Sequence, residues 1–153
     1  MSMNKTQKTI LLLSILILAS CASAKTVDLA GLPVHQSSKL PGIQFVPLLT
    51  EDTAMAKDIY IGWIYLAPNT TVPLHTHPSS QEKIILIEGA ASLLGPDQET
   101  SFNEGDSISI APKQPHGIKT GRKAVILFQQ YDPAIDGMRI YRFPELGGDH
   151  HAR

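Results

Sequence analysis

The sequence predicts an all-β domain, built as a sandwich or a small barrel, and three observations support this class. The 153-residue chain contains 11 glycines and 11 prolines, which is a heavy load of turn formers for this length. Short apolar runs alternate with polar turns at a spacing of about ten residues. No segment of useful length shows the periodicity of an amphipathic helix. With 42% hydrophobic and 18% charged residues, the composition supports one folded domain.

The first 20 residues differ in kind from the rest and predict an export signal. Lys5 and Lys8 precede an apolar run at residues 9–19 (TILLLSILILA), which is shorter than the roughly 20 residues that span a bilayer. We expect residues 1–20 to be a cleaved signal peptide. The run ends in residues 18–21 (LASC), which resemble a bacterial lipobox and imply a lipid on Cys21.

Two destinations follow from this signal. Lipidation of Cys21 predicts a periplasm-facing membrane lipoprotein that touches the membrane only through its lipid. The alternative is soluble export to the periplasm or the medium, because residues 22–24 (ASA) also fit ordinary signal cleavage before Lys25. Either cleavage leaves a domain without a free thiol, which suits an oxidising compartment.

The elements expected after this signal are short strands. Residues 21–42 read as a tether with one short edge strand, and residues 43–153 as a single barrel with a C-terminal extension. The expected strands cover residues 43–49, 59–66, 83–87, 90–94, 107–110, 117–119 and 124–130. Glycine, proline and aspartate punctuate the connections, and Asp106 is interpreted as a turn residue whose carboxylate binds nearby backbone N–H groups. After Tyr131 the chain is less regular, and we expect it to pack back along a sheet or toward a neighbouring subunit.

Charge and cysteine content exclude several function classes. The formal net charge is −1, and it becomes −3 once Lys5 and Lys8 are removed, so the chain lacks the basic excess of a nucleic-acid-binding protein. A single cysteine excludes both an internal disulfide framework and a cysteine-rich zinc site. Any metal ligands must therefore be His, Asp or Glu.

Four residues form a candidate metal-binding set. His75 and His77 lie two apart, so a strand would place both imidazoles on one face. Glu82 stands just before the apolar run 83–87, where a bend would return its carboxylate to the same face. His116 follows a later strand and turn, and a neighbouring antiparallel strand would present it to the other three.

At this point the residues resemble the cupin superfamily in both of its motifs. The matching pattern is Gly62, His75-x-His77-x4-Glu82-x6-Gly89, then Gly105-Asp106, Pro112 and His116. The resemblance implies a double-stranded β-helix, or jelly-roll barrel, in which His75, His77, Glu82 and His116 hold one divalent transition metal ion. Lys113 stands where the family places a glycine, and Thr120 replaces a frequent asparagine.

The resemblance leaves the metal and the reaction open. A His₃Glu set suits Fe, Mn, Ni, Co, Cu or Zn. The first hypothesis is a metalloenzyme acting on a small oxygen-bearing molecule, of dioxygenase, decarboxylase, isomerase or lyase type, with Glu82 also acting as a base. The alternative is a non-catalytic periplasmic protein that binds a small ligand, and a third reading is a metal that only stabilises the barrel. Barrels of this family commonly pair, so we expect a homodimer.

Candidate substrate contacts lie on the predicted strands. Trp63, Tyr65 and Phe128 are aromatic residues that would line the barrel mouth. Gln130 and Tyr131 end an apolar strand, where a polar side chain needs a solvated site because its hydrogen bonds would otherwise be lost. Gln81 is a weaker candidate for supporting the metal ligands.

Overall fold

The computed structural model describes residues 32–49 and 58–146, which are built almost wholly from antiparallel strands. The larger sheet contains β1 (His35–Gln36), β2 (Ile43–Pro47), β3 (Tyr60–Leu66), β10 (Val125–Asp132), β5 (Gln81–Glu88) and β8 (Ser107–Ile110), in that order. The smaller sheet contains β4 (Thr71–His75), β9 (His116–Thr120), β6 (Ala90–Leu94) and β7 (Glu99–Asn103). The predicted signal peptide, including Cys21, lies outside the described residues.

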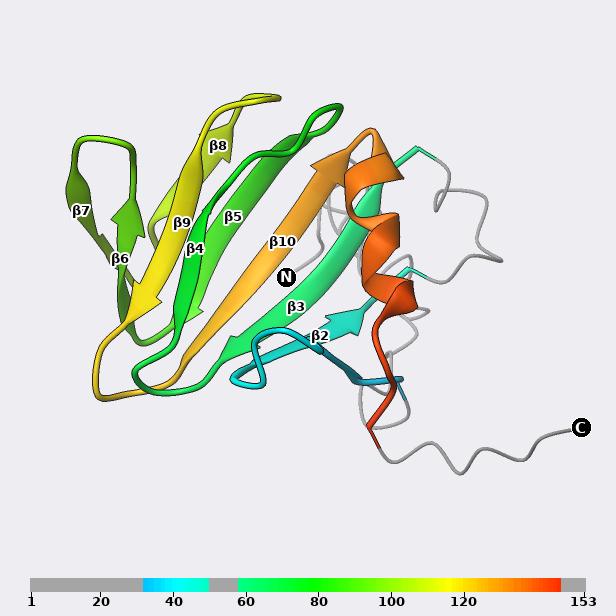
Figure 1. Cartoon of the computed structure of the whole chain (residues 1–153), viewed down its shortest axis with the longest axis horizontal. Helices are drawn as coiled ribbons and strands as arrows, with labels where there is room; N and C mark the ends of the chain where they lie inside the picture. The colour runs from blue at the N-terminus through cyan, green and yellow to red at the C-terminus, as the bar shows by residue number, and fades with distance from the viewer. Residues whose placement is uncertain (1–31, 50–57, 147–153) are drawn as a thin grey trace, which may run out of the picture. The chain divides into compact units, whose positions relative to one another are not determined.

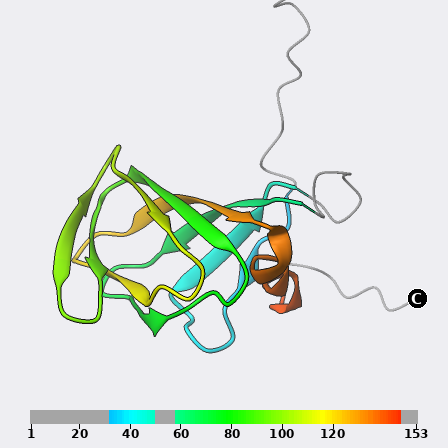
Figure 2. The same ribbon diagram turned by 90° about the horizontal axis from the view of Figure 1, so that it is seen from above.

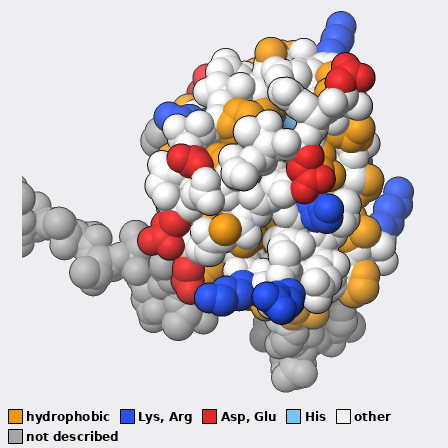
Figure 3. All heavy atoms as spheres, turned by 90° about the vertical axis from the view of Figure 1, so that its left-hand side faces the viewer, with side chains coloured by type: hydrophobic (Ala, Val, Ile, Leu, Met, Phe, Trp, Pro, Cys, Tyr) orange, Lys and Arg blue, Asp and Glu red, His pale blue; other side chains and the backbone are white. Residues whose placement is uncertain are grey.

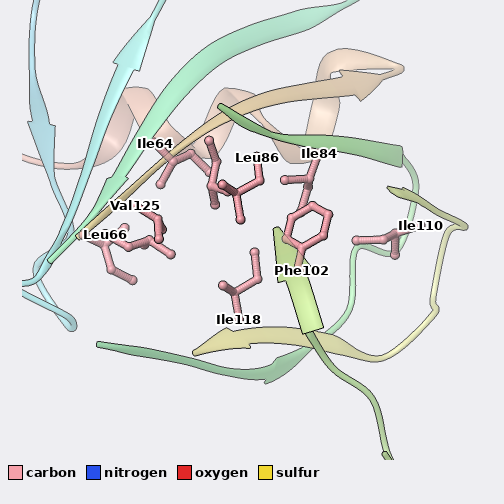
Figure 4. Packing of buried hydrophobic residues seen from close by; sticks show 10 residues of the cluster. Ile64, Leu66, Ile84, Leu86, Phe102, Ile110, Ile118 and Val125 are labelled. Atoms are coloured by element: carbon pink, nitrogen blue, oxygen red, sulfur yellow. The ribbon is translucent and has the colours of Figure 1, made fainter. Parts of the chain in front are cut away.

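The two sheets face each other and enclose the main core (Figures 1 and 2). Alternate side chains of each strand point inward, as the two-residue repeat of a strand requires. The buried core residues are Ile43, Ile64, Leu66, Ile84, Leu86, Phe102, Ile110, Ile118, Val125 and Leu127. In Figure 4 the labelled side chains of β3, β5 and β10 project toward Phe102 and Ile118 of the other sheet. The predicted all-β jelly roll is confirmed.

Two strands of the smaller sheet, β4 and β7, were not predicted from the sequence. β4 has the sequence TVPLH and includes a proline, and β7 has the polar sequence ETSFN with only one buried residue. Both are edge strands, where proline and polar residues are tolerated because one row of backbone groups needs no partner. Neither strand therefore carries the apolar alternation on which the prediction depended.

Several predicted turn residues have the conformation that their sequence suggested. Gly89 and Gly105 adopt φ values of 95° and 86°, in the left-handed region that favours glycine. The Asp106 carboxylate accepts a hydrogen bond from the backbone N–H of Asn103 at 2.8 Å. Lys113, at the family's glycine position, also has a left-handed φ of 66°. The turn before His116 therefore keeps its shape at some cost in backbone strain.

The C-terminal segment packs back onto the barrel beside the end of β10. It forms two short 3-10 helices, η3 (Ala134–Asp136) and η4 (Met138–Arg142), which lie at the end of the sheet where β10 finishes (Figure 1). Ala134 and Ile140 form a second small core with Tyr60 and Tyr131. Beyond η4, residue 145 forms a β-bridge with His35. Among residues 32–49 and 58–146, no helix has both the length and the apolarity to cross a membrane.

A carboxylate of η3 fixes the loop between β4 and β5. Asp136 is buried and accepts hydrogen bonds from the backbone N–H groups of Ser79 and Ser80 at 2.9 and 2.8 Å. Burial alone would raise the pKa of Asp136, but these hydrogen bonds outweigh it and lower that pKa below its ordinary value. The C-terminal extension thus holds the loop that carries His77.

The face at the left of Figure 1 shows acidic, basic and hydrophobic side chains in small separate groups, with almost no histidine surface (Figure 3). This mixture of charges agrees with the low net charge of the chain. It is not the continuous basic surface that nucleic-acid binding requires.

Candidate metal centre

The structure brings together the four residues selected from the sequence. One potential ligand atom from each of His75, His77, Glu82 and His116 lies within 4.8 Å of every other. The ring centroids of His75 and His116 are 4.3 Å apart, and those of His75 and His77 are 4.9 Å apart. Three of the four side chains are buried, and His75 is half-buried.

Pairing of β4 with β9 sets His75 opposite His116. The two residues are direct partners in the antiparallel register, next to an irregularity in β4 between Val72 and His75. Gly117, which follows His116, makes this approach possible. A Cβ atom at Gly117 would lie 2.6 Å from the Val72 carbonyl oxygen and 3.1 Å from the Pro73 carbonyl carbon.

His77 reaches the cluster by a different route from the one predicted. β4 ends at His75, so His75 and His77 do not share one strand face. His77 lies in the following loop, where its carbonyl accepts a hydrogen bond from the Lys113 N–H at 2.7 Å. The left-handed conformation of Lys113 is therefore part of what positions His77.

Glu82 needs no bend to face the histidines. It is the second residue of β5 and shares the buried face of that strand with Ile84 and Leu86. Its Oε2 lies 2.9 Å from the Nε2 atoms of both His77 and His116. Gln81 points outward from the same strand and is exposed.

The hydrogen bonds at the outer ring nitrogens decide which nitrogen faces the cluster with a lone pair. Nδ1 of His75 lies 2.9 Å from the Pro73 carbonyl oxygen, and Nδ1 of His116 lies 3.0 Å from the Gln114 carbonyl oxygen. A carbonyl oxygen only accepts, so both Nδ1 atoms carry the proton when the rings are neutral. Nε2 of each ring is then free to bind a metal ion.

His77 has a different partner. Its Nδ1 lies 2.9 Å from a guanidinium nitrogen of Arg139, on η4. A guanidinium only donates hydrogen bonds, so Nδ1 accepts and the ring proton resides on Nε2, facing Glu82. Arg139 and a metal ion thus favour opposite tautomers of His77.

Burial and these contacts shift the pKa values of the cluster in opposite directions. Burial alone would raise the pKa of Glu82, but contacts with His116, His77 and Gln129 outweigh it and hold that pKa well below its ordinary range. Burial lowers the pKa of His75. For His116, burial acts in the same direction, but the contact with the Glu82 carboxylate outweighs it and raises the pKa.

The donor set fits a first-row divalent ion. Glu82 Oε2 and His116 Nε2 are both buried and lie only 2.9 Å apart, and with the His116 proton on Nδ1 the two atoms face each other with lone pairs. Two facing lone pairs at this distance repel each other unless a cation lies between or beside them, either a proton or a metal ion. Metal bonds to nitrogen and oxygen are about 2.0–2.2 Å long, so one ion could contact these atoms after small side-chain adjustments.

Gln129 and Tyr131, both on β10, contact the cluster. Tyr131 was selected from the sequence, but Gln129 was not. The Gln129 amide donates hydrogen bonds to Glu82 Oε1 and, at 2.6 Å, to the Tyr131 hydroxyl. That hydroxyl lies 3.3 Å from His77 Nε2. Burial, followed by the Glu82 charge, raises the pKa of Tyr131 well above its ordinary value, so the phenol stays protonated.

The four predicted substrate contacts lie on the other face of the large sheet. Alternation along β3 and β10 turns Ile64 and Leu127 inward, and it turns their neighbours Trp63, Tyr65, Phe128 and Gln130 outward. Trp63 and Phe128 are cross-strand partners that pack edge to face, with centroids 5.8 Å apart. The aromatic residues of this set were expected to line the barrel mouth, whereas none of the four lines the cavity of the barrel. The inward-facing glutamine of β10 is Gln129.

A cavity of about 560 Å³ opens beside the cluster. His75, Glu82 and His116 form part of its wall, and Gln129 and Tyr131 add polar groups. Seven aliphatic side chains of the two sheets add apolar surface: Ile43, Ile64, Leu66, Val72, Ile84, Ile118 and Leu127. The volume of the cavity is within the range of small-molecule sites.

Comparisons with known proteins agree with this architecture. The family model described as "Cupin domain" matches residues 62–128. A germin-like protein from Morus alba is 28% identical over 90 residues, which cover 55% of this chain and 43% of that protein. The chain thus spans less than half the length of this relative.

Solved structures resemble the fold at low sequence identity. The polyketide cyclase RemF from Streptomyces resistomycificus superposes with a TM-score of 0.63 at 20% identity, covering 71% of this chain and 79% of that one. A predicted oxalate decarboxylase from Thermotoga maritima gives 0.62 at 17% identity, with coverage of 71% and 99%. An RmlC-like cupin from Shewanella frigidimarina gives 0.62 at 16% identity, with coverage of 76% and 96%.

Proposed function

This chain is a member of the cupin superfamily, and from that premise we propose that it is a divalent-metal-binding protein acting outside the cytoplasm as a metalloenzyme. Its substrate class is a small oxygen-bearing molecule. The reaction is of dioxygenase, decarboxylase, isomerase or lyase type. Neighbours with similar folds carry out several different chemistries, so the fold alone does not select among these reactions.

One observation carries this proposal. Glu82 Oε2 and His116 Nε2 are buried and 2.9 Å apart, and their residues form part of the wall of a cavity large enough for a small molecule. Because the Gln114 carbonyl holds Nδ1 of His116, Nε2 of the neutral ring turns a lone pair toward the Glu82 carboxylate. A lone pair and a carboxylate this close together favour a bound cation.

The residues divide into ligands and groups that support them. His75, His77, Glu82 and His116 would hold the ion, which when bound would act as a Lewis acid toward a substrate oxygen. The Pro73 and Gln114 carbonyls orient two of the imidazoles. Gln129 holds the other oxygen of Glu82 and so orients the carboxylate. Because the pKa of Glu82 lies below its ordinary range, it would act as a base only toward a substrate proton that the bound ion makes more acidic.

Tyr131 is positioned to supply a proton in the same site. Its hydroxyl accepts a hydrogen bond from Gln129, stays protonated because of burial, and is part of the cavity wall. Glu82 and Tyr131 therefore provide one base and one acid on the same side of the cavity.

A second candidate function is non-catalytic capture of a small ligand in the periplasm. The predominantly aliphatic lining of the cavity favours it, because such walls bind an apolar body without providing further catalytic groups. A ligand-dependent rise in Tm without turnover, across a panel of oxygenated compounds, would support this function over catalysis.

We further propose export, with a lipid on Cys21 and soluble release after residue 24 as the alternative. Mass spectrometry of the N-terminal peptide distinguishes the two, because diacylglyceryl on Cys21 adds a large defined mass and cleavage before Lys25 removes the residue. We also propose a homodimer, which light scattering of the purified protein tests. A monomer mass would reject it.

The enzyme proposal is tested on protein taken directly from its own compartment. Elemental analysis identifies the ion, and the same preparation is then screened against small oxygenated compounds under air and under nitrogen. Oxygen-dependent turnover selects the dioxygenase class, and oxygen-independent turnover selects the others. The Glu82→Gln variant serves as the control, and turnover equal to wild type in that variant would reject the role of Glu82.

A further inference from the structure

The cavity beside the His/Glu cluster has three cationic side chains in its wall. Arg139 and Arg142 come from η4, and Lys39 comes from the loop between β1 and β2. Arg139 and Arg142 are three residues apart, and a 3-10 helix has three residues per turn, so both project from the same face of η4. Two separate segments thus place exposed, positively charged side chains at the wall of one cavity.

These cations lack acidic partners within the described part of the chain. None of the ion pairs between described residues includes Lys39, Arg139 or Arg142. Among residues 32–49 and 58–146, Glu82 is the only acidic one in the cavity wall, and its carboxylate is already engaged by His77, His116 and Gln129. The cavity therefore carries an uncompensated positive charge, which favours an anionic ligand.

Arg139 places part of this charge next to the candidate metal centre. One guanidinium nitrogen is 2.9 Å from Nδ1 of His77, so the guanidinium lies one imidazole ring away from the clustered ligand atoms. Its other N–H groups remain available, because a guanidinium has five donors in a planar fork that matches a carboxylate. Arg142 makes no hydrogen bond to any described residue and is exposed.

The remaining lining restricts the rest of the ligand. Residues such as Ile64, Ile118 and Leu127 form an aliphatic wall across both sheets. Burying methylene groups against such a wall is favourable, whereas a second charged group there would lose its hydration without a partner. The walls thus favour an apolar body attached to a single anionic head.

We infer that the cavity binds an amphiphilic monocarboxylate, whose carboxylate is held by Arg139 and Arg142 near the His/Glu cluster and whose apolar body lies against the aliphatic wall. This inference rests on the proposed function in that it names the ligand class of the same site. Arg139 and Arg142 are specificity-determining residues in this assignment. Lys39 adds long-range attraction at the opening.

Isothermal titration calorimetry on the full chain tests the assignment with hexanoate and 1-hexanol, which differ in the charge of the head group. Hexanoate is expected to bind at least about tenfold more tightly than hexanol, because a charge-assisted contact replaces a neutral one. Arg139→Gln and Arg142→Gln are each expected to lose about tenfold in hexanoate affinity and to leave hexanol binding unchanged. Arg122→Gln removes the same charge from an exposed turn outside the cavity and is expected to match wild type.

Elemental analysis of the same samples separates this inference from the proposed function. Arg139→Gln is expected to hold at least as much metal as wild type, because the variant removes a positive charge from beside His77 and leaves an amide oxygen that can accept a hydrogen bond from Nδ1–H of that ring. Reduced hexanoate affinity together with undiminished metal content in Arg139→Gln supports the assignment of the carboxylate to Arg139 and Arg142. Equal affinities for hexanoate and hexanol, or an equal loss in Arg122→Gln, would overturn it even if metal is bound. If the wild-type protein binds hexanoate selectively but holds no metal, the carboxylate site is supported and the proposal of a metalloenzyme is rejected.

Discussion

Substitution of Gly117 by alanine tests how closely β4 and β9 must approach to align His75 with His116. The added Cβ would lie 2.6 Å from the Val72 carbonyl oxygen and 3.2 Å from the Leu74 nitrogen. Ordinary van der Waals contact begins at about 3.4 Å, so the overlap with the oxygen is roughly 0.8 Å. The obstacle is backbone, which cannot rotate away as a flexible side chain does.

The cost of this overlap can be estimated. Forcing a methyl group into a well-packed site costs about 1–3 kcal/mol, which corresponds to a fall in Tm of about 3–10 °C for a domain of this size. The two strands must also move apart at the position where His75 and His116 pair. A displacement of several tenths of an ångström is large compared with the tolerance of about 0.2 Å in metal–ligand distances, so metal affinity falls as well.

The assay compares Gly117→Ala with Gly121→Ala by thermal unfolding and by metal content after dialysis. A Cβ added at Gly121, in the turn between β9 and β10, would meet no atom of the described residues within 4 Å apart from its own chain neighbours. Its substitution is expected to leave Tm unchanged or to raise it slightly, because alanine lowers the entropy of the unfolded chain. A Gly117→Ala protein with wild-type Tm and full metal content would refute the claim that close strand approach builds the site.

Four further outcomes follow from particular groups. Lys113→Gly relieves a left-handed φ of 66° and is expected to raise the free energy of unfolding by about 0.5–1 kcal/mol; a lower urea midpoint in this variant would contradict it. Asp136→Ala leaves two backbone N–H groups of the β4–β5 loop without an acceptor and is expected to cost about 1–3 kcal/mol, measured by urea unfolding at pH 7; an unchanged midpoint would count against this anchor. Metal content is expected to fall as pH drops through about 6, because a coordinating imidazole must be neutral and free histidine titrates near 6.5. The raised pKa of His116 means that this ring protonates at higher pH than His75, whose pKa is lowered; full metal retention at about pH 4 would contradict the requirement for neutral imidazoles. In the metal-free protein the depressed pKa of Glu82 stabilises the fold above the ordinary carboxyl value of 4.5, and this stability is lost as pH falls through the folded value; an identical acid unfolding profile for Glu82→Gln would refute it.

The candidate metal centre was accessible from the sequence because its signal is chemical and strictly spaced. His75, His77, Glu82 and His116 are the residue types that a transition metal needs, and the structure places them together. The backbone conformation that positions each ligand was only partly predictable, because His77 lies in a loop and Glu82 occupies a regular strand position. Residue identity determined the site more strongly than the expected local conformation did.

The inner face of β10 was harder to predict. This strand lies between β3 and β5 in the large sheet and contains apolar residues on both of its faces. Alternation therefore does not reveal which of Gln129 and Gln130 points inward. The register with β5, which sets Tyr131 opposite Glu82, decides it, and such a pairing is a tertiary property.

The role of the C-terminal segment could not be predicted from local patterns. Residues 133–142 show no helical periodicity of useful length, and 3-10 turns are too short to produce one. Arg139 reaches His77 only because Asp136 and the aromatic residues around Tyr60 fix η3 and η4 against the barrel. A contact between residues so far apart in the sequence cannot be predicted from the spacing of charged residues.

Elemental analysis of purified wild type beside the variant His75→Ala, His77→Ala, His116→Ala tests the metal centre most directly. The account predicts about one divalent ion per chain in the wild type and none in the variant, with circular dichroism showing that the variant keeps its β structure. The same stoichiometry in both proteins would contradict the assignment of the ion to these imidazoles.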